Sequence, residues 1–394
     1  MKYEWQECTI GDLGQIVTGK TPPTKNNEYW GGKVMFITPK DIQATKHIFK
    51  TERYVTSEGK VAVRGAILPK GSICVSCIGN IGYLGITTEE CISNQQINSI
   101  IVNENNDIDF VYYLLKSLWA YFKKYEGQST ALSILNKTQF SKIKVQIPNI
   151  EVQKKIASVL KILDEKIELN NAINNNLLEQ VLTLYRNRFV DTVNNERRIC
   201  RADEYFDISI GKTPPRKEPQ WFSTNPKDVT WVSISDMGTC GLYISCSSEQ
   251  LTKEAVDRHN VKIVPDNTVL LSFKLTVGRI AITNGEMTTN EAIAHFKTDK
   301  KEINEYLYCY LKCFNYQTMG STSSIATAVN SKIIKGMPFV VPTDDELMDF
   351  QSVAAPMFAK IKANQTESEK LTAVRDTLLP KLMSGELDVS GIDL

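Results

Sequence analysis

The feature that most constrains this chain is that much of its sequence occurs twice. Gly19-Lys20-Thr21-Pro22-Pro23 returns as Gly211-Lys212-Thr213-Pro214-Pro215, and residues 68–97 align without a gap on residues 264–293. The identical pairs in the second block are Pro69/Pro265, Ser76/Ser272, Gly82/Gly278, Ile86/Ile282, Thr87/Thr283, Glu90/Glu286, Asn94/Asn290 and Ile97/Ile293. Solenoid repeats are only about 20–50 residues long, so this much longer period indicates a duplicated domain.

Each copy is followed by a segment with the apolar spacing of a coiled coil. The first segment carries Ile156, Leu160, Leu163, Ile167, Asn170, Asn174, Leu177, Val181 and Leu184. The second carries Phe350, Ala354, Met357, Ile361, Asn364, Ser368, Leu371, Arg375 and Leu378. Steps of four and three residues alternate in both segments, as in a coiled-coil seam. A polar seam residue fixes register, so Asn170 and Asn364 are predicted coiled-coil register residues.

This order predicts an α+β protein: two mixed α/β domains separated by two long antiparallel helices that form a coiled coil, with a pseudo-twofold internal repeat. The predicted parts are a first domain over 1–148, a spacer helix over 149–190, a second domain over 191–342, and a spacer helix and tail over 343–394. We expect Pro356 to kink the second helix and Pro380 to end or bend it. Residues 73–78 and 269–273 are predicted strands, and residues 110–124 and 304–316 are predicted helices.

The bulk composition points to a reduced, soluble protein and gives no global sign of a nucleic-acid partner. The formal net charge is +1, so any basic surface must be local. Nine cysteines without framework spacing predict reduced thiols and a cytoplasmic protein. No stretch is long and apolar enough to span a membrane, and the polar start of the sequence lacks the apolar core of a signal peptide.

Motifs that would indicate catalysis are matched only superficially. Residues 14–21 fit the phosphate-loop pattern by letter, but the prolines that follow keep Lys20 from starting a helix, and the second copy has Phe206 in place of the first glycine. Cys74 and Cys77 form a CxxC whose duplicate is Leu270 and Phe273, which favours core packing. The three histidines have no evident partners. We therefore predict no catalytic residue, no metal site and no enzyme activity.

Polar and basic loop residues are the remaining candidates for function. Such side chains suit phosphate contact and hydrogen bonding to base edges. The predicted DNA-binding residues are Lys20, Thr21, Lys25, Lys40, Asn80, Lys212, Thr213, Arg216, Lys217, Trp221, Lys274 and Arg279. The alternative is that these are ordinary solvated loops. The two copies keep Gly-Lys-Thr-Pro-Pro, Ser76, Gly82 and Asn94 while neighbouring loop residues diverge, as expected if each copy reads a different sequence.

Taken together, these motifs resemble the specificity subunits of type I restriction–modification systems over nearly the whole chain. The resemblance is carried by Trp5 and residues 10–14 leading to Gly19-Lys20-Thr21-Pro22, by the block 69–97, and by residues 147–156. It is strongest in the ending, Thr377-Leu378-Leu379-Pro380-Lys381-Leu382-Met383-Ser384-Gly385-Glu386-Leu387. The second copy departs from the pattern at Glu291-Ala292, where the first has Gln95-Gln96, and at Pro356.

The resemblance implies a function and a set of partners. Each domain would be a target-recognition domain that reads one half of an asymmetric, interrupted site in double-stranded DNA, and the paired helices would act as a ruler between half-sites. The helices would dock two methyltransferase (modification) subunits, to which restriction/translocase subunits are added. S-adenosylmethionine, ATP and magnesium are expected on those partner subunits, with no cofactor bound by this chain. A coiled-coil scaffold that never contacts DNA and a stand-alone DNA-modifying enzyme remain as alternatives.

Overall fold

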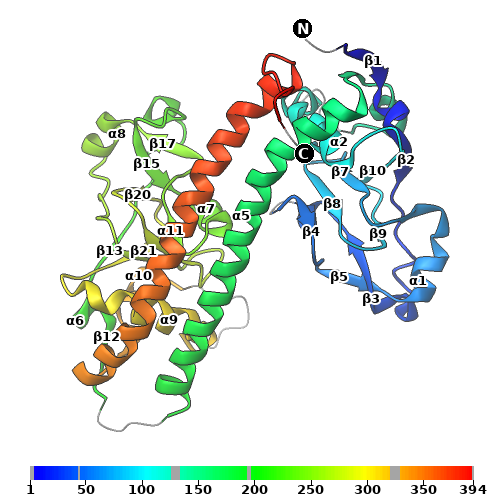
Figure 1. Cartoon of the computed structure of the whole chain (residues 1–394). Coiled ribbons are helices and arrows are strands. Elements are labelled where there is room, and N and C mark those ends of the chain that lie inside the picture. Colours follow the sequence, from blue (N-terminus) through cyan, green and yellow to red (C-terminus); the bar gives the residue numbers. More distant parts are fainter. Residues whose placement is uncertain (1–3, 43–44, 126–133, 193–196, 320–328, 393–394) are drawn as a thin grey trace. The chain divides into compact units, whose positions relative to one another are not determined.

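The computed structural model describes residues 4–42, 45–125, 134–192, 197–319 and 329–392. The chain divides into two compact units (Figure 1). Unit 1 consists of Met1–Leu169 and Ser368–Leu394, and unit 2 of Asn170–Glu367. Each unit therefore combines one α/β domain with part of both long helices. The Ser/Thr tracts expected to form loops around Ser129 and Ser323 lie outside the described residues.

Unit 1 contains three sheets and four short helices. The five-stranded sheet has the order β2 (Gly14–Thr18), β10 (Ile97–Val102), β7 (Ile73–Ser76), β8 (Leu84–Thr87) and β4 (His47–Ile48). The four-stranded sheet has the order β5 (Arg53–Val55), β3 (Trp30–Ile37), β9 (Cys91–Ser93) and β6 (Ile67–Leu68), and β1 (Gln6–Thr9) pairs with β11 (Lys144–Ile147). The helices are α1 (Ser57–Ala62), α2 (Ile108–Ser117), α3 (Trp119–Lys123) and α4 (Lys137–Ser141).

Unit 2 has the same plan. Its five-stranded sheet has the order β13 (Asp207–Ile210), β21 (Ile293–Lys297), β18 (Val269–Ser272), β19 (Ile280–Thr283) and β16 (Tyr243–Ile244). Its four-stranded sheet has the order β14 (Phe222–Ser223), β17 (Glu249–Leu251), β15 (Val229–Val232) and β20 (Thr288–Thr289), and β12 (Ile199–Arg201) pairs with β22 (Pro338–Val340). The helices are α6 (Ala202–Tyr205), α7 (Ile234–Thr239), α8 (Lys253–Arg258), α9 (Asn304–Cys313) and α10 (Ser331–Lys335).

The two five-stranded sheets correspond strand for strand, including the parallel pair at one edge, β4 with β8 and β16 with β19. The bridge between Val264 and Met287 takes the place of the β6–β9 pair. The duplicated domain and the mixed α/β fold class predicted from the sequence are thereby confirmed. The predicted helix 110–124 is two helices, α2 and α3, and the predicted helix 304–316 ends as α9 at Cys313.

The residues repeated in both copies are those that hold the backbone of the loops. Ser76 Oγ donates to the carbonyl of Asn80 at 2.6 Å, and Ser272 Oγ donates to the carbonyl of Thr276 at the same distance. Thr87 and Thr283 bind the carbonyls of Pro69 and Pro265, and the Asn94 and Asn290 side chains each accept from the backbone two residues on. These bonds from side chains to the backbone fix the course of the loops, which explains why these positions are identical while exposed neighbours differ.

Two repeated glycines are required by geometry. Gly82 and Gly278 adopt φ of 95° and 89°, in the left-handed region that other residues rarely occupy. A Cβ on Gly82 would also meet the Phe122 and Trp119 side chains, and a Cβ on Gly278 would meet Tyr316. The same turn, packed against an aromatic side chain, therefore exists in both units.

The long helices α5 (Ile150–Tyr185) and α11 (Asp344–Met383) each contribute to both units. A short π-helix, Arg186–Val190, follows α5. The helix α11 runs through Pro356 and Pro380, so Pro380 does not end the helix, while the bends expected at these two prolines stay predictions. Both prolines are exposed, so the carbonyls that lose an N–H partner to them can be hydrated.

In unit 2 the segments of α5 and α11 lie side by side in antiparallel register. The Asn170 side chain donates to the carbonyl of Asn364 at 3.4 Å and to the Glu367 carboxylate at 2.8 Å. Asn364 Nδ2 donates to Asn174 Oδ1 at 2.8 Å, and Asn174 donates to the carbonyl of Ile361 at 3.5 Å. Asn170 and Asn364 are 0% and 2% exposed. The two asparagines thus lie on the seam and contact each other, while their role in register stays a prediction.

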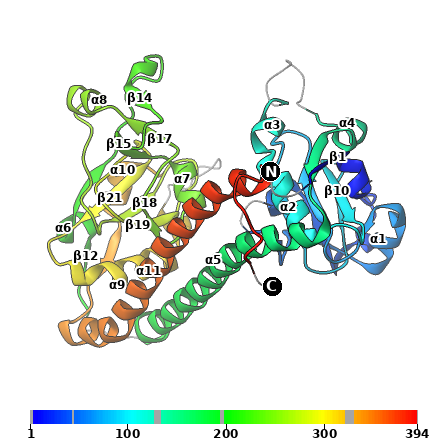
Figure 2. The same cartoon turned by 45° about the horizontal axis from the view of Figure 1, so that its top comes forward.

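Each domain packs on its helix segments through one aromatic-rich helix. In unit 1 that helix is α2, which lies beside α5 (Figure 2) and shares a core with Leu160 of α5 and Leu382 of α11. In unit 2 the equivalent helix is α9, whose Tyr306 packs against Tyr185 of α5 and Phe350 of α11. We refer to these two contacts as the helix joints of the domains.

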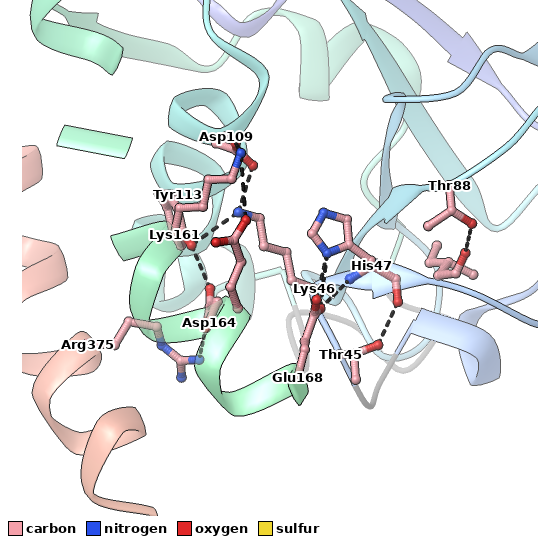
Figure 3. A network of polar contacts seen from close by, with 12 residues as sticks. Thr45, Lys46, His47, Thr88, Asp109, Tyr113, Lys161, Asp164, Glu168 and Arg375 are labelled. Carbon is pink, nitrogen blue, oxygen red and sulfur yellow. Dashed lines mark hydrogen bonds and ion pairs between the residues drawn. The ribbon is translucent and has the colours of Figure 1, made fainter. Parts of the chain in front are cut away.

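The helix joint of unit 1 contains a buried ionic network (Figure 3). Lys46 Nζ lies 2.7 Å from Asp109 and donates to the Tyr113 hydroxyl at 3.2 Å. Tyr113 donates to Asp164 of α5 at 2.7 Å, and Arg375 of α11 donates to the other oxygen of Asp164 at 2.6 Å. The side chains of Lys46, Asp164 and Arg375 are only 2%, 5% and 12% exposed. The domain, α5 and α11 are therefore joined by charges shielded from water.

Two further contacts extend this network along α5. Burial alone would raise the pKa of Asp109, but Lys46 and Lys161 of α5 lower it below its usual value. Glu168 accepts the backbone N–H of His47 at 3.0 Å and also contacts the imidazole (Figure 3). Successive turns of α5 thus bind two different segments of the same domain.

The helix joint of unit 2 has apolar residues at four charged positions of unit 1, although Asp109 corresponds to Glu305 and Glu168 to Lys362. The equivalent pairs are Lys46/Leu242, Lys161/Ala355, Asp164/Phe358 and Arg375/Val181. Leu242, Phe358 and Val181 belong to one buried cluster, and the Tyr308 ring meets the Phe358 ring edge-on with centroids 5.6 Å apart. The two domains share a fold but are fixed to the helices by different chemistry.

We predict that Asp164→Ala lowers the free energy of unfolding by roughly 3–5 kcal/mol, because it leaves Arg375 buried without its carboxylate. The double substitution Asp164→Phe with Arg375→Val installs the pair found in unit 2 and should recover most of that loss. Urea unfolding monitored by circular dichroism measures both. A single variant no less stable than the double variant would contradict the ionic account of this joint.

We predict that Asn170→Leu keeps or raises stability, because it replaces a buried amide on the seam with an apolar side chain, but loosens the register of the helices. Spin labels at the exposed positions 172 and 363 should then give a broader distance distribution than in the same labelled chain with Asn170. A narrow distribution together with a marked loss of stability would show that Asn170 contributes packing and not register.

Candidate nucleic-acid interface

Two of the predicted loops come together in unit 2. We call residues 212–217 the proline segment and residues 274–278 the tip loop. Thr213 of the proline segment donates to the Glu291 carboxylate. Burial raises the pKa of Glu291, but the bond from Thr213 and the nearby charges of Lys274 and Arg216 bring it below its usual value. The carbonyl of Ala292, the next residue, accepts the Phe273 N–H at 2.9 Å at the base of the tip loop, so Glu291 lies between the proline segment and the tip loop.

Arg216 is a packed residue as well as a surface cation. Its guanidinium pairs with both oxygens of Glu249, at 2.8 and 3.0 Å, and lies 4.2 Å from the Phe222 ring centroid and 4.6 Å from that of Trp231. About half of its side chain remains exposed. Because one carboxylate already partners the charge, Arg216 offers less to a phosphate than the exposed Lys212, Lys217 and Lys274.

The structure corrects one predicted DNA-binding residue of unit 2, Trp221, while the contact of Arg279 with DNA stays a prediction. Trp221 is 4% exposed, belongs to a buried cluster with Trp231, and donates its indole N–H to Glu218 at 2.9 Å, so no face of the ring is offered to DNA. Arg279 is half-buried and donates to the carbonyl of Ile234 at 2.6 Å, which fixes the start of α7. Sequence alone could not separate these from surface residues, because both lie in polar loops.

The equivalent residues of unit 1 have a similar arrangement with less charge. Thr21 donates to Gln95 at 2.5 Å, which is the counterpart of the Thr213–Glu291 bond. Lys40 lies 3.9 Å from Glu52, and both side chains are well exposed. Lys20, Lys25 and Asn80 are also exposed. The structure thus places the remaining unit 1 candidates at the surface, and their contact with DNA stays a prediction.

An aromatic cluster beside the turn of unit 1 was missed in the sequence. Lys123 lies 4.1 Å from the Trp119 ring centroid and 5.2 Å from that of Tyr83, and these two rings meet edge-on at 5.3 Å. Trp119 is 41% exposed and borders Gly82. Exposed aromatic rings beside lysines suit contact with bases and phosphates. The interleaved aromatics and lysines of residues 119–125 were the available signal.

Three of the reactive side chains that the sequence raised as candidates for catalysis are buried. Cys74 and Cys77 are buried, and burial raises the pKa of their thiols to about 12 and about 11. His295 is buried between Ser209 and Thr289, and burial lowers its pKa to about 3. In the described part of the chain no group of three or more His, Cys, Asp and Glu could hold a metal ion. Residues 14–21, which match the phosphate-loop pattern, form the strand β2 and the segment that follows it, not the start of a helix.

Comparison with known proteins gives a family model and relatives that are all described as type I restriction specificity domains or subunits. Residues 2–179 and 198–374 each match the model of a family described as the type I restriction modification DNA specificity domain. The MjaIX specificity subunit of a type I restriction enzyme from Methanocaldococcus jannaschii is 29% identical, over 98% of this chain and 94% of its own length. The HindI specificity subunit from Haemophilus influenzae is 35% identical, over 48% of this chain and 41% of its own length.

A solved structure shares the fold. The S subunit of a type I restriction–modification system from M. genitalium is 16% identical, with a TM-score of 0.53 over 97% of this chain and 96% of that one. The duplicated α/β domain and the long helices thus recur in a protein of very different sequence.

No helix among the described residues is both long and apolar enough to cross a membrane.

Proposed function

This chain belongs to the family of type I restriction–modification DNA specificity domains, and from this we propose that it reads a bipartite, asymmetric DNA site without catalysing a reaction itself. Each α/β domain would read one half-site. The single observation that carries the proposal is the repeat: one set of loop-fixing residues occurs twice, with different exposed side chains at the equivalent positions.

The differences between the two surfaces fit two different half-sites. The proline segment of unit 2 has Arg216 and Lys217, where that of unit 1 has Thr24 and Lys25. Beside them unit 2 has the carboxylate of Glu291, where unit 1 has the amide of Gln95. Lysine and arginine bind phosphates and guanine edges, and amides bind adenine edges, so a change in these side chains changes the bases that are preferred.

The proposed partners supply the chemistry that this chain lacks. We propose that α5 and α11 dock two modification subunits, that restriction and translocase subunits join that complex, and that the chain works in the cytoplasm. S-adenosylmethionine, ATP and magnesium would be bound by those subunits. The buried thiols and the absence of a metal-binding group among the described residues are compatible with a chain that only recognises DNA.

The proposal is tested with the full chain assembled with its modification subunits, and with duplex DNA carrying the site that is methylated in cells containing the complete system. Lys217→Ala and Lys274→Ala should each weaken binding at low salt, because each removes an exposed cation, the first from the proline segment and the second from the tip loop. Each should also lower the slope of log affinity against log salt by about one for every phosphate that is no longer neutralised. Arg216→Ala should weaken binding too, and it also removes the packing of the guanidinium on Trp231.

Lys253→Ala is the matched control, because Lys253 is equally exposed but lies on α8, outside both loops. It should leave affinity and salt slope unchanged. If the complex of the unchanged chain shows no preference for the methylated sequence, the proposed function is wrong. If the Lys217 and Lys274 variants match the Lys253 control, the proline segment and the tip loop of unit 2 do not contact phosphate.

A further inference from the structure

The tip loop of unit 2 holds an apolar side chain that packs against nothing. Leu275 is 100% exposed, the highest value among the exposed large hydrophobic residues of the described chain. The flanking Lys274 and Thr276 are exposed as well. Because the Leu275 side chain is fully exposed, it contributes no hydrophobic burial energy to the folding of this domain.

The backbone at Leu275 is also strained. Its φ is 60°, in the left-handed region that leucine rarely adopts. The Thr276 N–H donates to the carbonyl of Lys274 at 2.6 Å, so Leu275 is the central residue of a three-residue turn of the uncommon kind with positive φ. Strain of this kind persists only where surrounding structure imposes it, and it concentrates at functional sites.

The rest of the loop holds this conformation firmly. Ser272 Oγ donates to the carbonyl of Thr276 at 2.6 Å and accepts the Arg279 N–H at 3.0 Å. The Gly278 N–H donates to the carbonyl of Ser272 at 3.0 Å, and the Phe273 N–H donates to that of Ala292 at 2.9 Å. These hydrogen bonds fix the backbone of the turn on which Leu275 stands.

Unit 1 shows that the fold does not require this residue. Its equivalent turn has the same bond from Ser76 to the carbonyl of Asn80, and Gly79 stands at the position of Leu275 with φ of 78°. Glycine adopts this conformation without strain. Two domains with one turn thus differ at its tip by the presence or absence of an isobutyl group.

We propose that Leu275 contacts a base in the half-site read by unit 2, and that its partner is the 5-methyl group of a thymine in the major groove. The neighbours favour DNA over a protein surface, because the tip loop carries Lys274 and starts beside Ala292, next to Glu291, which binds Thr213 of the cationic proline segment. Among base edges in the major groove, the thymine methyl is the apolar group that an aliphatic side chain can recognise. This inference rests on the proposed function and assigns one specificity-determining residue within it.

The stability of variants separates this role from a structural one. Leu275→Gly installs the residue of unit 1 and removes the strain, so its melting temperature should equal or exceed that of the unchanged chain. Leu275→Ala should leave the melting temperature nearly unchanged, since the side chain that it shortens is fully exposed. A clear loss of stability in both variants would show that Leu275 serves the fold, and would overturn the proposal.

The binding test uses the full chain with its modification subunits and duplex DNA containing the methylated sequence. Leu275→Ala should weaken binding to this site about tenfold, while affinity for a duplex without the site and the salt slope stay the same, because no phosphate contact changes. Ile199→Ala removes another well-exposed apolar side chain of unit 2, on β12, and should have no effect. Equal affinities of the unchanged and Leu275→Ala complexes would overturn the inference.

Replacing single thymines of the site by uracil identifies the partner, because uracil lacks only the methyl group. With the unchanged chain, uracil at one position of the half-site read by unit 2 should weaken binding about fourfold, the factor expected for one buried methyl group. The Leu275→Ala complex should be insensitive at that position. If no position responds in this way, the thymine contact is wrong. If the unchanged complex binds no site selectively, the proposed function fails as a whole.

Discussion

The attachment of each α/β domain to its own segment of the helix pair is the constraint on which the structure depends. In unit 1 this attachment is ionic: Asp164 and Arg375 on the two helices reach Tyr113 and Lys46 of the domain. In unit 2 the same place is filled by apolar side chains, among them Phe358. A domain moved to the other joint would place Tyr113 opposite Phe358 without the carboxylate of Asp164, and would deprive Asp109 of its contact with Lys161. Buried polar and charged groups that lose partners are costly.

The candidate DNA-binding loops combine a fixed frame with variable tips. Side chains that bind backbone carbonyls, such as Ser76 and Ser272, fix one turn in both units and leave the tip residues free to vary. Unit 1 has Gly79 at the tip and Trp119 nearby, whereas unit 2 has Leu275 at the tip and the half-buried Tyr316 beside the turn. A fixed frame with variable tips allows one fold to read two base sequences without redesigning its core.

Much of the fold could be predicted from the sequence, because the repeat and the 3.5-residue period are properties of the sequence itself. The helix continues past Pro380 to Met383, since an exposed proline near a helix end is tolerated where water can replace the lost donor. The residues of the candidate DNA-binding site were harder to predict from the sequence. Trp221 and Arg279 lie in polar loops but turn inward, and only tertiary contacts reveal this. Nothing in the sequence marked Leu275 as a candidate binding residue, because neither its exposure nor its positive φ can be inferred from the sequence alone.

The most direct test replaces the second α/β domain, residues 198–342, with a copy of the first, residues 4–148, and maps the methylated sequence in cells that carry the complete system. The helix joint must be changed with it, by Phe358→Asp, Ala355→Lys and Val181→Arg, so that the transplanted Tyr113 and Asp109 regain the contacts that Asp164 and Lys161 provide in unit 1. The account predicts a site in which the bases of the first half appear in both halves. Methylation of the original two-part sequence by this chain would contradict it.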